Sequence, residues 1–275
     1  MKNIMIIGAG GSLGSCLSGF LKQEGHEIIA VDINENSLAR LHRVYEILIE
    51  NIYIENILDF SRLKRIIEFK KIDLVINCAA LKHVLWCEYN IKYAINTNII
   101  ANLELINYMR ERNKEFLYIS SDKATNPKNI YALTKQFTDY IIKFYNFKLV
   151  RGVNFINSNG SVLDIWEEQR KEGVPFTLID NDDCNRFFIS LRQMCYLIKE
   201  AIDDASGKNE YTPEVIYKIY IKDLFKAYLQ LNNIKEYKIR KVSLQDNEKV
   251  SEDLCFDADV VEIKEISDIV TLMRK

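Results

Sequence analysis

The chain has 275 residues, of which 48% are hydrophobic and 28% are charged, a composition typical of a folded protein with one large or two small domains. Lysine and arginine total 37 while aspartate and glutamate total 39, so the formal net charge is −2. This balance argues against nucleic acid or an anionic membrane surface as the main partner.

The apolar runs are short: residues 4–7 and 74–81 fall well below the roughly 20 residues that a membrane-spanning helix needs. The N-terminus lacks the basic segment and apolar core of a secretory signal. We therefore expect a cytoplasmic protein with no membrane span. The three histidines share no metal-binding spacing, so we expect no metal site. No C-x-x-C pair occurs, so we expect free thiols at Cys16, Cys78, Cys87, Cys184, Cys195 and Cys255.

Strand and helix patterns alternate along residues 1–155. Buried-strand patterns occupy residues 2–7, 27–32, 51–54, 73–78, 116–121 and 147–153. Helical spacing of apolar residues falls between them, at residues 12–24, 36–45, 60–69, 90–110 and 130–145. This alternation predicts an α/β fold: a Rossmann-like, doubly wound parallel sheet with crossover helices.

The pattern becomes less regular in residues 156–275. We expect helices at residues 161–171, 191–202 and 222–231, and a short strand at residues 176–179. Residues 203–213 are polar and predict a surface loop. This part of the chain is predicted to form a smaller, mixed α/β C-terminal lobe.

Five of the ten glycines fall within the first nineteen residues, and three of them, Gly8, Gly11 and Gly14, form G-x-x-G-x-x-G between a strand and a helix. Glycines allow a tight turn and close approach of the backbone to a pyrophosphate, while N–H groups at the helix start, at Ser12 and Leu13, can bind phosphate. The motif predicts a dinucleotide site. The alternative is a plain tight turn without a ligand.

Asp32 ends the second predicted strand. A carboxylate there can accept hydrogen bonds from both adenosine ribose hydroxyls and repel a 2′-phosphate. It favours NAD over NADP as the cofactor. The alternative is a surface aspartate without a ligand.

A second group of polar residues follows the strand that ends at Ser121, where Asp122 and Lys123 precede Tyr131 and Lys135. Tyr and Lys at positions i and i+4 share one helix face, so the ammonium can lower the phenol pKa. The phenolate can then remove a hydroxyl proton while hydride leaves the carbon. The alternatives are an ordinary surface Tyr/Lys pair and a loop salt bridge between Asp122 and Lys123.

These motifs resemble the extended short-chain dehydrogenase/reductases, and among them the polysaccharide-biosynthesis nucleotide-sugar 4,6-dehydratases, typified by UDP-N-acetylglucosamine 4,6-dehydratase. The resemblance rests on AALKHV at residues 79–84, on TN at residues 97–98 and on SDKATNP at residues 121–127, followed by Tyr131 and Lys135. It continues in VN at residues 153–154, SNGSV at residues 158–162 and NRF at residues 185–187.

The resemblance implies a mechanism. Tyr131 deprotonates the sugar hydroxyl at carbon 4 while NAD accepts hydride, Lys135 lowers the phenol pKa and Ser121 hydrogen-bonds the reacting oxygen. Lys123 then acts as the base at carbon 5, and Asp122 protonates the departing hydroxyl of carbon 6. Hydride returns to carbon 6 and regenerates NAD.

The resemblance also assigns binding residues. It places residues 1–155 as the NAD-binding domain and residues 156–275 as the nucleotide-sugar-binding lobe. Cofactor contacts are expected from Gly8, Gly11, Ser12, Leu13, Gly14, Asp32, Asn56, Ile57, Ala79, Ala80, Asn98, Tyr131 and Lys135. Substrate contacts are expected from Lys82, His83, Asn154, Ser158, Gly160, Ser161 and Arg186. The alternatives for His83 and Arg186 are a helix-start residue and a surface salt bridge.

Two other functions remain open at this stage. A nucleotide-sugar epimerase would use Tyr131 and NAD without needing Asp122 and Lys123. A non-catalytic dinucleotide-binding regulator would keep the fold alone, although retention of Ser121, Tyr131 and Lys135 together argues against it. The resemblance also suggests a homo-oligomer, a dimer or larger, in which the helices at residues 90–110 and 130–145 pair with their copies.

Overall fold

The computed structural model describes residues 1–244, 247–254 and 256–274. The chain divides into two compact units. Unit 1 comprises Met1–Arg151 and Cys195–Tyr211, and unit 2 comprises Gly152–Met194 and Thr212–Lys275. This division differs from the single boundary expected at residue 155, because the chain returns to unit 1 after residue 194.

Unit 1 is built on a seven-stranded sheet with the strand order β10-β6-β5-β4-β1-β2-β3. Its neighbouring strands run parallel, as in the pairing of β1 with both β2 and β4. The predicted Rossmann-like α/β class is confirmed. The strands are β1 (Asn3–Ile7), β2 (Glu27–Asp32), β3 (Ile52–Ile54), β4 (Leu74–Asn77), β5 (Glu115–Ser121), β6 (Lys148–Gly152) and β10 (Glu210–Tyr211).

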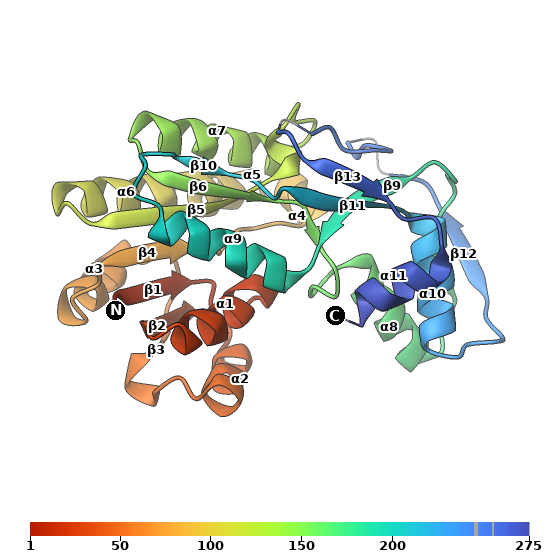
Figure 1. Ribbon diagram of the computed structural model, residues 1–275, viewed down its shortest axis with the longest axis horizontal. Coiled ribbons are helices and arrows are strands. Elements are labelled where there is room, and N and C mark those ends of the chain that lie inside the picture. The colour runs from red at the N-terminus through yellow and green to blue at the C-terminus, as the bar shows by residue number, and fades with distance from the viewer. Residues whose placement is uncertain (245–246, 255, 275) are drawn as a thin grey trace. The chain divides into compact units, whose positions relative to one another are not determined.

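The strands of unit 1 are buried because helices cover both faces of the sheet. Met5, Val75 and Tyr118 belong to one core cluster together with residues of α3, α6 and α7, whereas Figure 1 shows α1 and α9 in front of the sheet. The main helices are α1 (Ser12–Gln23), α2 (Glu35–Tyr45), α3 (Phe60–Phe69), α6 (Ala101–Glu111), α7 (Ile130–Phe144) and α9 (Leu191–Asp203), whose last nine residues lie in unit 1. Short 3₁₀ turns are η1 (Ile49–Asn51) and η3 (Asp122–Ala124).

The strand order reverses beside β1, which pairs with β2 on one side and β4 on the other. In open parallel sheets, ligands bind outside the carboxyl ends of the strands at such a point. The turn that begins at Gly8 follows β1, and the segment that begins at Cys78 follows β4. Topology alone therefore brings the glycine motif and the AALKHV block to one edge of the sheet.

The helix expected at residues 90–110 is divided in the structure. It consists of α5 (Ile91–Ile95), a π-helical segment η2 (Asn96–Ile100) and α6, and it is preceded by a short helix, α4 (Val84–Tyr89), that the sequence analysis did not predict. π-Helical turns inside α-helices are frequent at functional sites. Asn98, a predicted cofactor residue, lies in the middle of this one.

The prediction of a surface loop at residues 203–213 is wrong in one respect, because this segment contains the strand β10. Glu210 and Tyr211 pair in parallel with Leu149 and Val150 of β6. Tyr211 is fully buried, and its hydroxyl lies 2.7 Å from Asp204 Oδ2, to which it donates. The strand has only two residues, so its pattern cannot be distinguished from the polar sequence around it.

Unit 2 has a mixed four-stranded sheet of order β13-β11-β9-β7 and a parallel pair, β12 with β8. Trp166, which is fully buried, packs on Phe225 with ring centroids 4.9 Å apart, and both belong to the core of this unit. The strands are β7 (Asn154–Phe155), β8 (Phe176–Ile179), β9 (Asn185–Ile189), β11 (Val215–Tyr220), β12 (Ile239–Val242) and β13 (Asp259–Glu262). The helices are α8 (Val162–Glu172), α10 (Ile221–Leu231) and α11 (Ile266–Met273).

The cysteines within the described residues are free thiols. Cys16 and Cys195, both in unit 1, have Sγ atoms 3.6 Å apart and form no disulfide, whereas Cys255 lies outside the described residues. Across residues 1–244, 247–254 and 256–274, no helix has the length and apolar character needed to cross a bilayer.

Candidate active site

The glycine turn forms where β1 meets α1. Gly8 has a φ of +80°, and a Cβ atom there would lie 2.6 Å from the backbone nitrogen of Ala79. A Cβ atom on Gly14 would lie 2.1 Å from the carbonyl oxygen of Gly8. Side chains would clash with backbone atoms at both positions, so only glycine permits this tightly packed turn, the glycine cradle. α1 begins here, and its first residues, Ser12 and Leu13, follow an N-cap at Gly11 that provides no side-chain cap.

The Asp32 carboxylate lies beside this cradle at the end of β2. Its Oδ2 accepts a hydrogen bond from the Gly10 N–H at 2.8 Å, and its Oδ1 accepts one from the Asn34 N–H at 2.9 Å. These backbone donors hold the carboxylate in place next to the glycine turn. Each oxygen keeps a second lone pair that can accept from a ligand hydroxyl.

The other predicted cofactor residues of unit 1 follow the ends of β3 and β4. The Asn56 side chain accepts from the Leu58 N–H at 3.0 Å, and Ile57 is buried. The Ala79 N–H donates to the side chain of Asn77 at 2.9 Å, and Ala80 is partly exposed. Their positions agree with a ligand that runs along the carboxyl edge of the sheet.

Ser121, Asp122 and Lys123 form a connected polar group at the end of β5. The Ser121 hydroxyl donates to Asp122 Oδ1 at 2.9 Å, and the Lys123 ammonium donates to the same oxygen at 3.2 Å. Asp122 is fully buried, and its Oδ2 makes no hydrogen bond within the described part of the chain. Buried polar atoms without a partner are rare in native proteins. The salt bridge between Asp122 and Lys123, considered above as an alternative, is present. It is part of a larger polar group that includes Ser121.

Tyr131 lies in the first turn of α7. The helix start is fixed from two sides: Asn129 accepts from the Ala132 N–H at 2.9 Å, and Glu88 Oε1 accepts from the Ile130 N–H at 2.8 Å. Burial raises the pKa of Tyr131, and a hydrogen bond with the Ser121 side chain opposes this rise. The phenol thus lies near the polar group at the end of β5.

Lys135 lies one turn further along α7, also buried. Its ammonium donates to the Ile119 carbonyl oxygen at 2.8 Å and lies 4.5 Å from the centroid of the Tyr118 ring. Burial lowers its pKa to about 8, against the opposing effect of Asp139. Burial is the main cause of the raised pKa of Tyr131, and the Lys135 ammonium donates to a carbonyl of β5. The lowering of the Tyr131 pKa by Lys135 stays a prediction.

Asn98 is held by a hydrogen-bond network that the π-helical segment creates. Its side-chain oxygen accepts from the Leu81 N–H at 2.9 Å, and its amide donates to the Leu81 carbonyl at 3.0 Å and to Thr134 Oγ1 at 3.0 Å. Its own carbonyl accepts from Thr138 and Asn102. Asn98 therefore connects the AALKHV block to α7.

Lys82 and His83 are exposed on the segment that leads into α4. His83 is the N-cap residue of α4, and its side chain makes no capping hydrogen bond. Partial desolvation of the ring and the neighbouring charge of Lys82 lower the pKa of His83.

The predicted substrate residues of unit 2 lie on β7, on β9 and at the start of α8. The Asn154 amide donates to the Phe187 carbonyl at 2.9 Å. Ser161 caps α8 by accepting from the Asp164 N–H, and Gly160, at a φ of +70°, donates its N–H to Asp164 Oδ2. The Ser158 hydroxyl donates to the Phe155 carbonyl.

Arg186 in β9 uses one terminal nitrogen to donate to the carbonyls of Asn185 and Val250. The surface salt bridge considered for Arg186 is not among the ion pairs of the described residues; backbone carbonyls hold this side chain. Asn154 pairs with Phe188, two residues beyond Arg186, so the structure brings these two predicted residues onto neighbouring strands.

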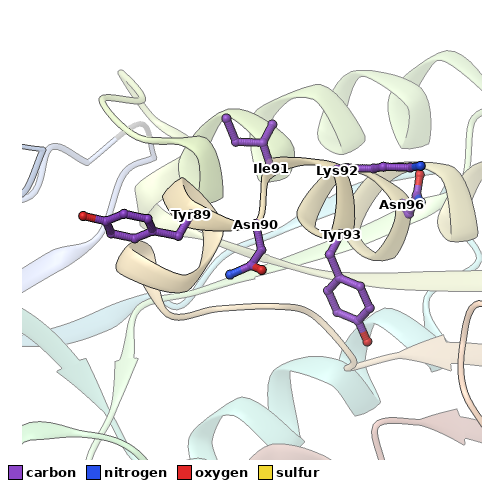
Figure 2. A pocket seen from close by; sticks show the side chains of 6 residues that line it. All are labelled: Tyr89, Asn90, Ile91, Lys92, Tyr93 and Asn96. Carbon is purple, nitrogen blue, oxygen red and sulfur yellow. The ribbon is translucent and has the colours of Figure 1, made fainter.

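A shallow pocket of about 430 Å³ opens where α4 meets α5. Figure 2 shows its lining residues: Tyr89, Asn90, Ile91, Lys92, Tyr93 and Asn96. Asn96 is also the first residue of the π-helical segment. The pocket therefore adjoins the segment that orients Asn98.

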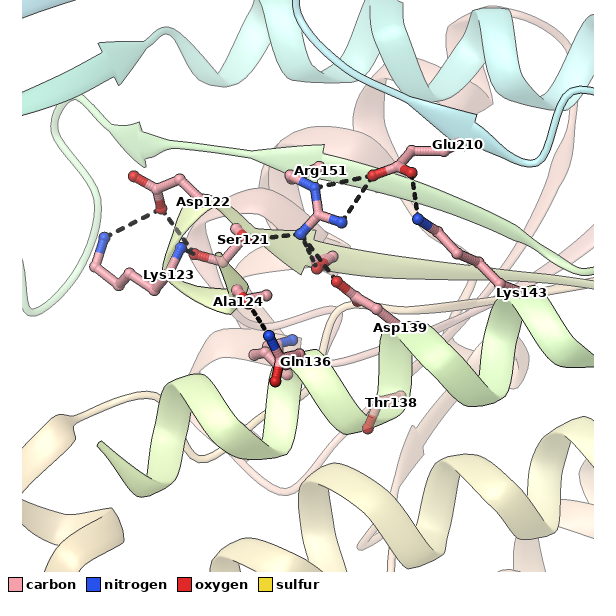
Figure 3. A network of polar contacts seen from close by, with 12 residues as sticks. Ser121, Asp122, Lys123, Ala124, Gln136, Thr138, Asp139, Lys143, Arg151 and Glu210 are labelled. Atoms are coloured by element: carbon pink, nitrogen blue, oxygen red, sulfur yellow. Dashed lines mark hydrogen bonds and ion pairs between the residues drawn. The ribbon is translucent and has the colours of Figure 1, made fainter. Parts of the chain in front are cut away.

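The sequence analysis missed three charged residues behind the polar group. Arg151 in β6 contacts Asp139 of α7 and Glu210 of β10, and Figure 3 shows these side chains next to Ser121. One signal was available, because Arg151 directly follows the apolar pair Leu149 and Val150 inside the strand predicted at residues 147–153. A charge in a buried strand needs a partner, but the sequence does not say which residue provides it.

The fold and the polar group define a Rossmann-like protein of the extended short-chain dehydrogenase/reductase class. Comparison with known proteins identifies the family: residues 4–274 match the family described as "Polysaccharide biosynthesis protein". The chain belongs to this family, and the resemblance inferred from its motifs is confirmed.

Three curated relatives illustrate the range of the family. An uncharacterized membrane protein of Methanocaldococcus jannaschii is 33% identical over 98% of this chain and 84% of its own length. The capsular polysaccharide biosynthesis protein CapD of Staphylococcus aureus is 30% identical over 92% of this chain, which spans only 45% of CapD. An inverting UDP-N-acetylglucosamine 4,6-dehydratase of Campylobacter jejuni is 28% identical over 78% of this chain and 67% of that enzyme.

Solved structures give the same fold. Pen from Bacillus thuringiensis superposes with a TM-score of 0.84 at 28% identity, covering 92% of this chain and 83% of Pen. A UDP-glucose 4-epimerase of Thermotoga maritima has a TM-score of 0.80 at 17% identity, covering 99% of this chain and 97% of the epimerase. The second likeness shows a shared fold.

The lowered pKa of Lys135 leads to a stability prediction. Its folded-state pKa of about 8 lies below the ordinary 10.5, so the unfolded chain binds more protons between these pH values. The cost of the buried charge is therefore complete below pH 8 and disappears as the pH rises toward 10.5. We expect Lys135→Met to be more stable than the wild type at pH 7, with a gain that shrinks between pH 8 and 10.5.

Urea unfolding at a series of pH values measures this gain. Lys114→Met is the matched control, because Lys114 is 38% exposed and pairs with Asp73 at the surface; it should show no such gain. A Lys135→Met protein that is less stable than the wild type at pH 7 would contradict the assignment and would mean that the attraction of Asp139 outweighs burial.

Proposed function

We propose that this chain is an NAD-dependent nucleotide-sugar 4,6-dehydratase. It would act on UDP-N-acetylglucosamine or a similar nucleoside-diphosphate hexose and give a 4-keto-6-deoxy sugar for surface polysaccharide or glycan biosynthesis. The observation that carries the proposal is the Asp122–Lys123 pair, bonded to Ser121 at the end of β5 and lying near the buried Tyr131. The membership of the family and the 28% identity to a UDP-N-acetylglucosamine 4,6-dehydratase support it.

The residues of unit 1 fit NAD. The glycine cradle at Gly8 and Gly14 leaves room for a pyrophosphate against backbone, and Asp32 presents a carboxylate beside it. The same carboxylate would repel the 2′-phosphate of NADP. Bound NAD would supply a hydride acceptor for carbon 4 and return the hydride to carbon 6.

The proton balance of a 4,6-dehydration suits the polar group. Oxidation at carbon 4 releases the proton of the carbon 4 hydroxyl, and departure of the carbon 6 hydroxyl as water consumes one proton. The proton taken from carbon 5 is returned there when hydride reaches carbon 6. The reaction therefore needs a path from oxygen 4 to oxygen 6 and one separate base at carbon 5.

Tyr131, Ser121 and Asp122 supply that path. Because its pKa is raised, Tyr131 holds its own proton at neutral pH. Accepting a proton from the sugar requires that the phenol proton passes to Ser121, whose hydroxyl donates to Asp122 Oδ1. Asp122 then carries the proton that the leaving hydroxyl needs, and Lys123 is the base at carbon 5.

The nucleotide part of the substrate is assigned by family resemblance. Lys82 and His83 would contact the sugar, and Asn154, Ser158, Gly160, Ser161 and Arg186 would contact the nucleotide diphosphate. Arg186 suits this role because a guanidinium binds phosphate oxygens through a planar fork.

A nucleotide-sugar epimerase on the same scaffold is the second candidate. It would use Tyr131 and NAD, but its reaction would not need Asp122 and Lys123 as acid and base. The burial of Asp122 in contact with both Ser121 and Lys123 favours the dehydratase. The mass of the product separates the two, because dehydration removes one water and epimerisation removes none.

Tyr131→Phe should reduce turnover by about 10²–10⁴-fold, since it removes the acid–base group while preserving the ring. Incubation with UDP-N-acetylglucosamine and a panel of other nucleotide sugars, followed by mass spectrometry, measures the loss of water. Tyr145→Phe, just past the end of the same helix, is the control and should retain activity. Near-normal dehydration by Tyr131→Phe would overturn the assignment.

Gly14→Ala should weaken NAD binding by at least about tenfold, or about 1.4 kcal/mol, because the new methyl group would enter the glycine cradle. Isothermal titration calorimetry with NAD measures this loss. Gly25→Ala is the control for backbone strain alone, because Gly25 has a φ of +86° while a Cβ atom there meets nothing within 4 Å. If Gly14→Ala binds NAD as well as Gly25→Ala does, the cofactor site lies elsewhere.

We also propose that the protein is a homo-oligomer formed through α7. Leu133, Phe137, Tyr140 and Phe144 repeat at helical spacing along α7, and each is between 48% and 81% exposed. On the neighbouring α4, Trp86 is 61% exposed. Contiguous apolar surface of this kind marks interaction sites in soluble proteins.

Phe137→Glu should therefore shift the protein toward the monomer, because it places a charge in the apolar surface. Light scattering after size-exclusion chromatography measures the mass of the particle. Phe69→Glu changes a phenylalanine on α3 that is 76% exposed, more than the 56% of Phe137, and should leave the mass unchanged. A wild-type protein that is already monomeric at high concentration would rule out this interface.

A further inference from the structure

Arg151 is the most enclosed cation of the polar network in Figure 3. Its side chain is 5% exposed, and its guanidinium contacts residues of three other elements. One terminal nitrogen lies 3.0 Å from the carbonyl oxygen of Ser121, 3.2 Å from Ser120 Oγ and 2.9 Å from Asp139 Oδ2. The Nε atom and the other terminal nitrogen donate to Glu210 Oε1 at 3.0 and 2.7 Å.

The charges around Arg151 compensate one another. Asp139 is 8% exposed and Glu210 is 28% exposed, while the ammonium of Lys143 lies 2.5 Å from the second oxygen of Glu210. Two cations thus face two carboxylates. Burial raises the pKa of Asp139, and Arg151 opposes this effect. An ion group of this kind is expensive to bury and is weak evidence for stability alone, so its geometry requires another explanation.

The elements that Arg151 joins are those that carry the reacting groups. The Ser121 carbonyl belongs to the end of β5, directly before Asp122 and Lys123, and Asp139 lies two helical turns after Tyr131 on α7. We propose that Arg151 is a positioning residue, whose single guanidinium holds the end of β5 at a fixed distance from α7. It thereby fixes the position of the Ser121 hydroxyl relative to the Tyr131 phenol.

The shape of the guanidinium is essential to this role. Its planar fork offers five N–H donors in fixed directions, whereas a lysine offers one point charge on a flexible stem. A lysine has one side-chain nitrogen, so it can reach the Ser121 carbonyl and Asp139 or it can pair with Glu210, but it cannot span both sides as the fork of Arg151 does. Arg151→Lys therefore keeps the charge balance while loosening the link between the end of β5, α7 and Glu210.

This inference rests on the proposed dehydratase function, and its test compares three variants. We expect Arg151→Lys and Arg151→Met to lower kcat for dehydration by up to about 10²-fold, the cost of a displacement of about 1 Å, with KM changed less than kcat. Arg151→Lys, which keeps the buried charges paired, should remain folded even if Arg151→Met does not. Arg112→Met, which removes an arginine paired with Glu68 at the surface, should behave as the wild type.

A double-variant cycle with Ser121→Ala separates positioning from general damage. If Arg151 acts through the placement of Ser121, then Arg151→Lys should cost much less kcat in the Ser121→Ala background than in the wild type. Losses that multiply in the double variant would overturn the proposal, as would an Arg151→Lys enzyme with normal kcat.

A spectroscopic measurement keeps this test independent of the substrate. With 3-fluorotyrosine at position 131, the ¹⁹F resonance should move in Arg151→Lys and Arg151→Met but not in Arg112→Met. An unmoved resonance refutes the positioning role whether or not the protein dehydrates a nucleotide sugar. A moved resonance in a protein without dehydratase activity would instead contradict the proposed function alone.

Discussion

A buried cation must be surrounded by acceptors, and this requirement determines how the elements of unit 1 meet beside the candidate site. Arg151 brings the end of β5, the middle of α7 and the short strand β10 to one point. It also explains the path of the chain: the segment Cys195–Tyr211 belongs to unit 1, and its last two residues supply both an edge strand and the carboxylate of Glu210.

The remaining features of the site follow from parallel strand order. All strands of such a sheet end at one edge, so the turn after β1, the segment after β4 and the polar group after β5 become neighbours although some 110 residues separate the first from the last. At Gly8 no side chain fits, so the sheet edge presents backbone groups there. At Ser121 it presents side chains, those of Ser121, Asp122 and Lys123. One sheet edge thus offers a binding surface and a reactive group from different strands.

Local patterns were sufficient to predict most of unit 1. β2 and α3 begin and end at the predicted residues, because periodicity and caps such as Asp59 are encoded within a few positions. The candidate site residues that belong to motifs could also be named from the sequence, and their roles stay predictions. The sequence did not predict β10, because a strand of two residues is too short to show an alternating pattern of apolar and polar residues. It did not predict the partners of Arg151 either, because Asp139 and Glu210 lie far from Arg151 in the sequence. In unit 2, β9, β11 and β13 depend on mixed pairing that no local pattern reveals.

The π-helical segment Asn96–Ile100 imposes a constraint on chain length. A π turn contains one residue more than an α turn, and each helical residue advances by about 100°. Deleting one residue here would therefore close the segment into a regular α turn and leave α5 and α6 in register, but it would remove the extra residue that places Asn98 against Leu81. The helix can lose the π turn without losing its packing, whereas the Asn98 network depends on that turn. Relatives that keep the Asn98 network should consequently show no gap in this stretch.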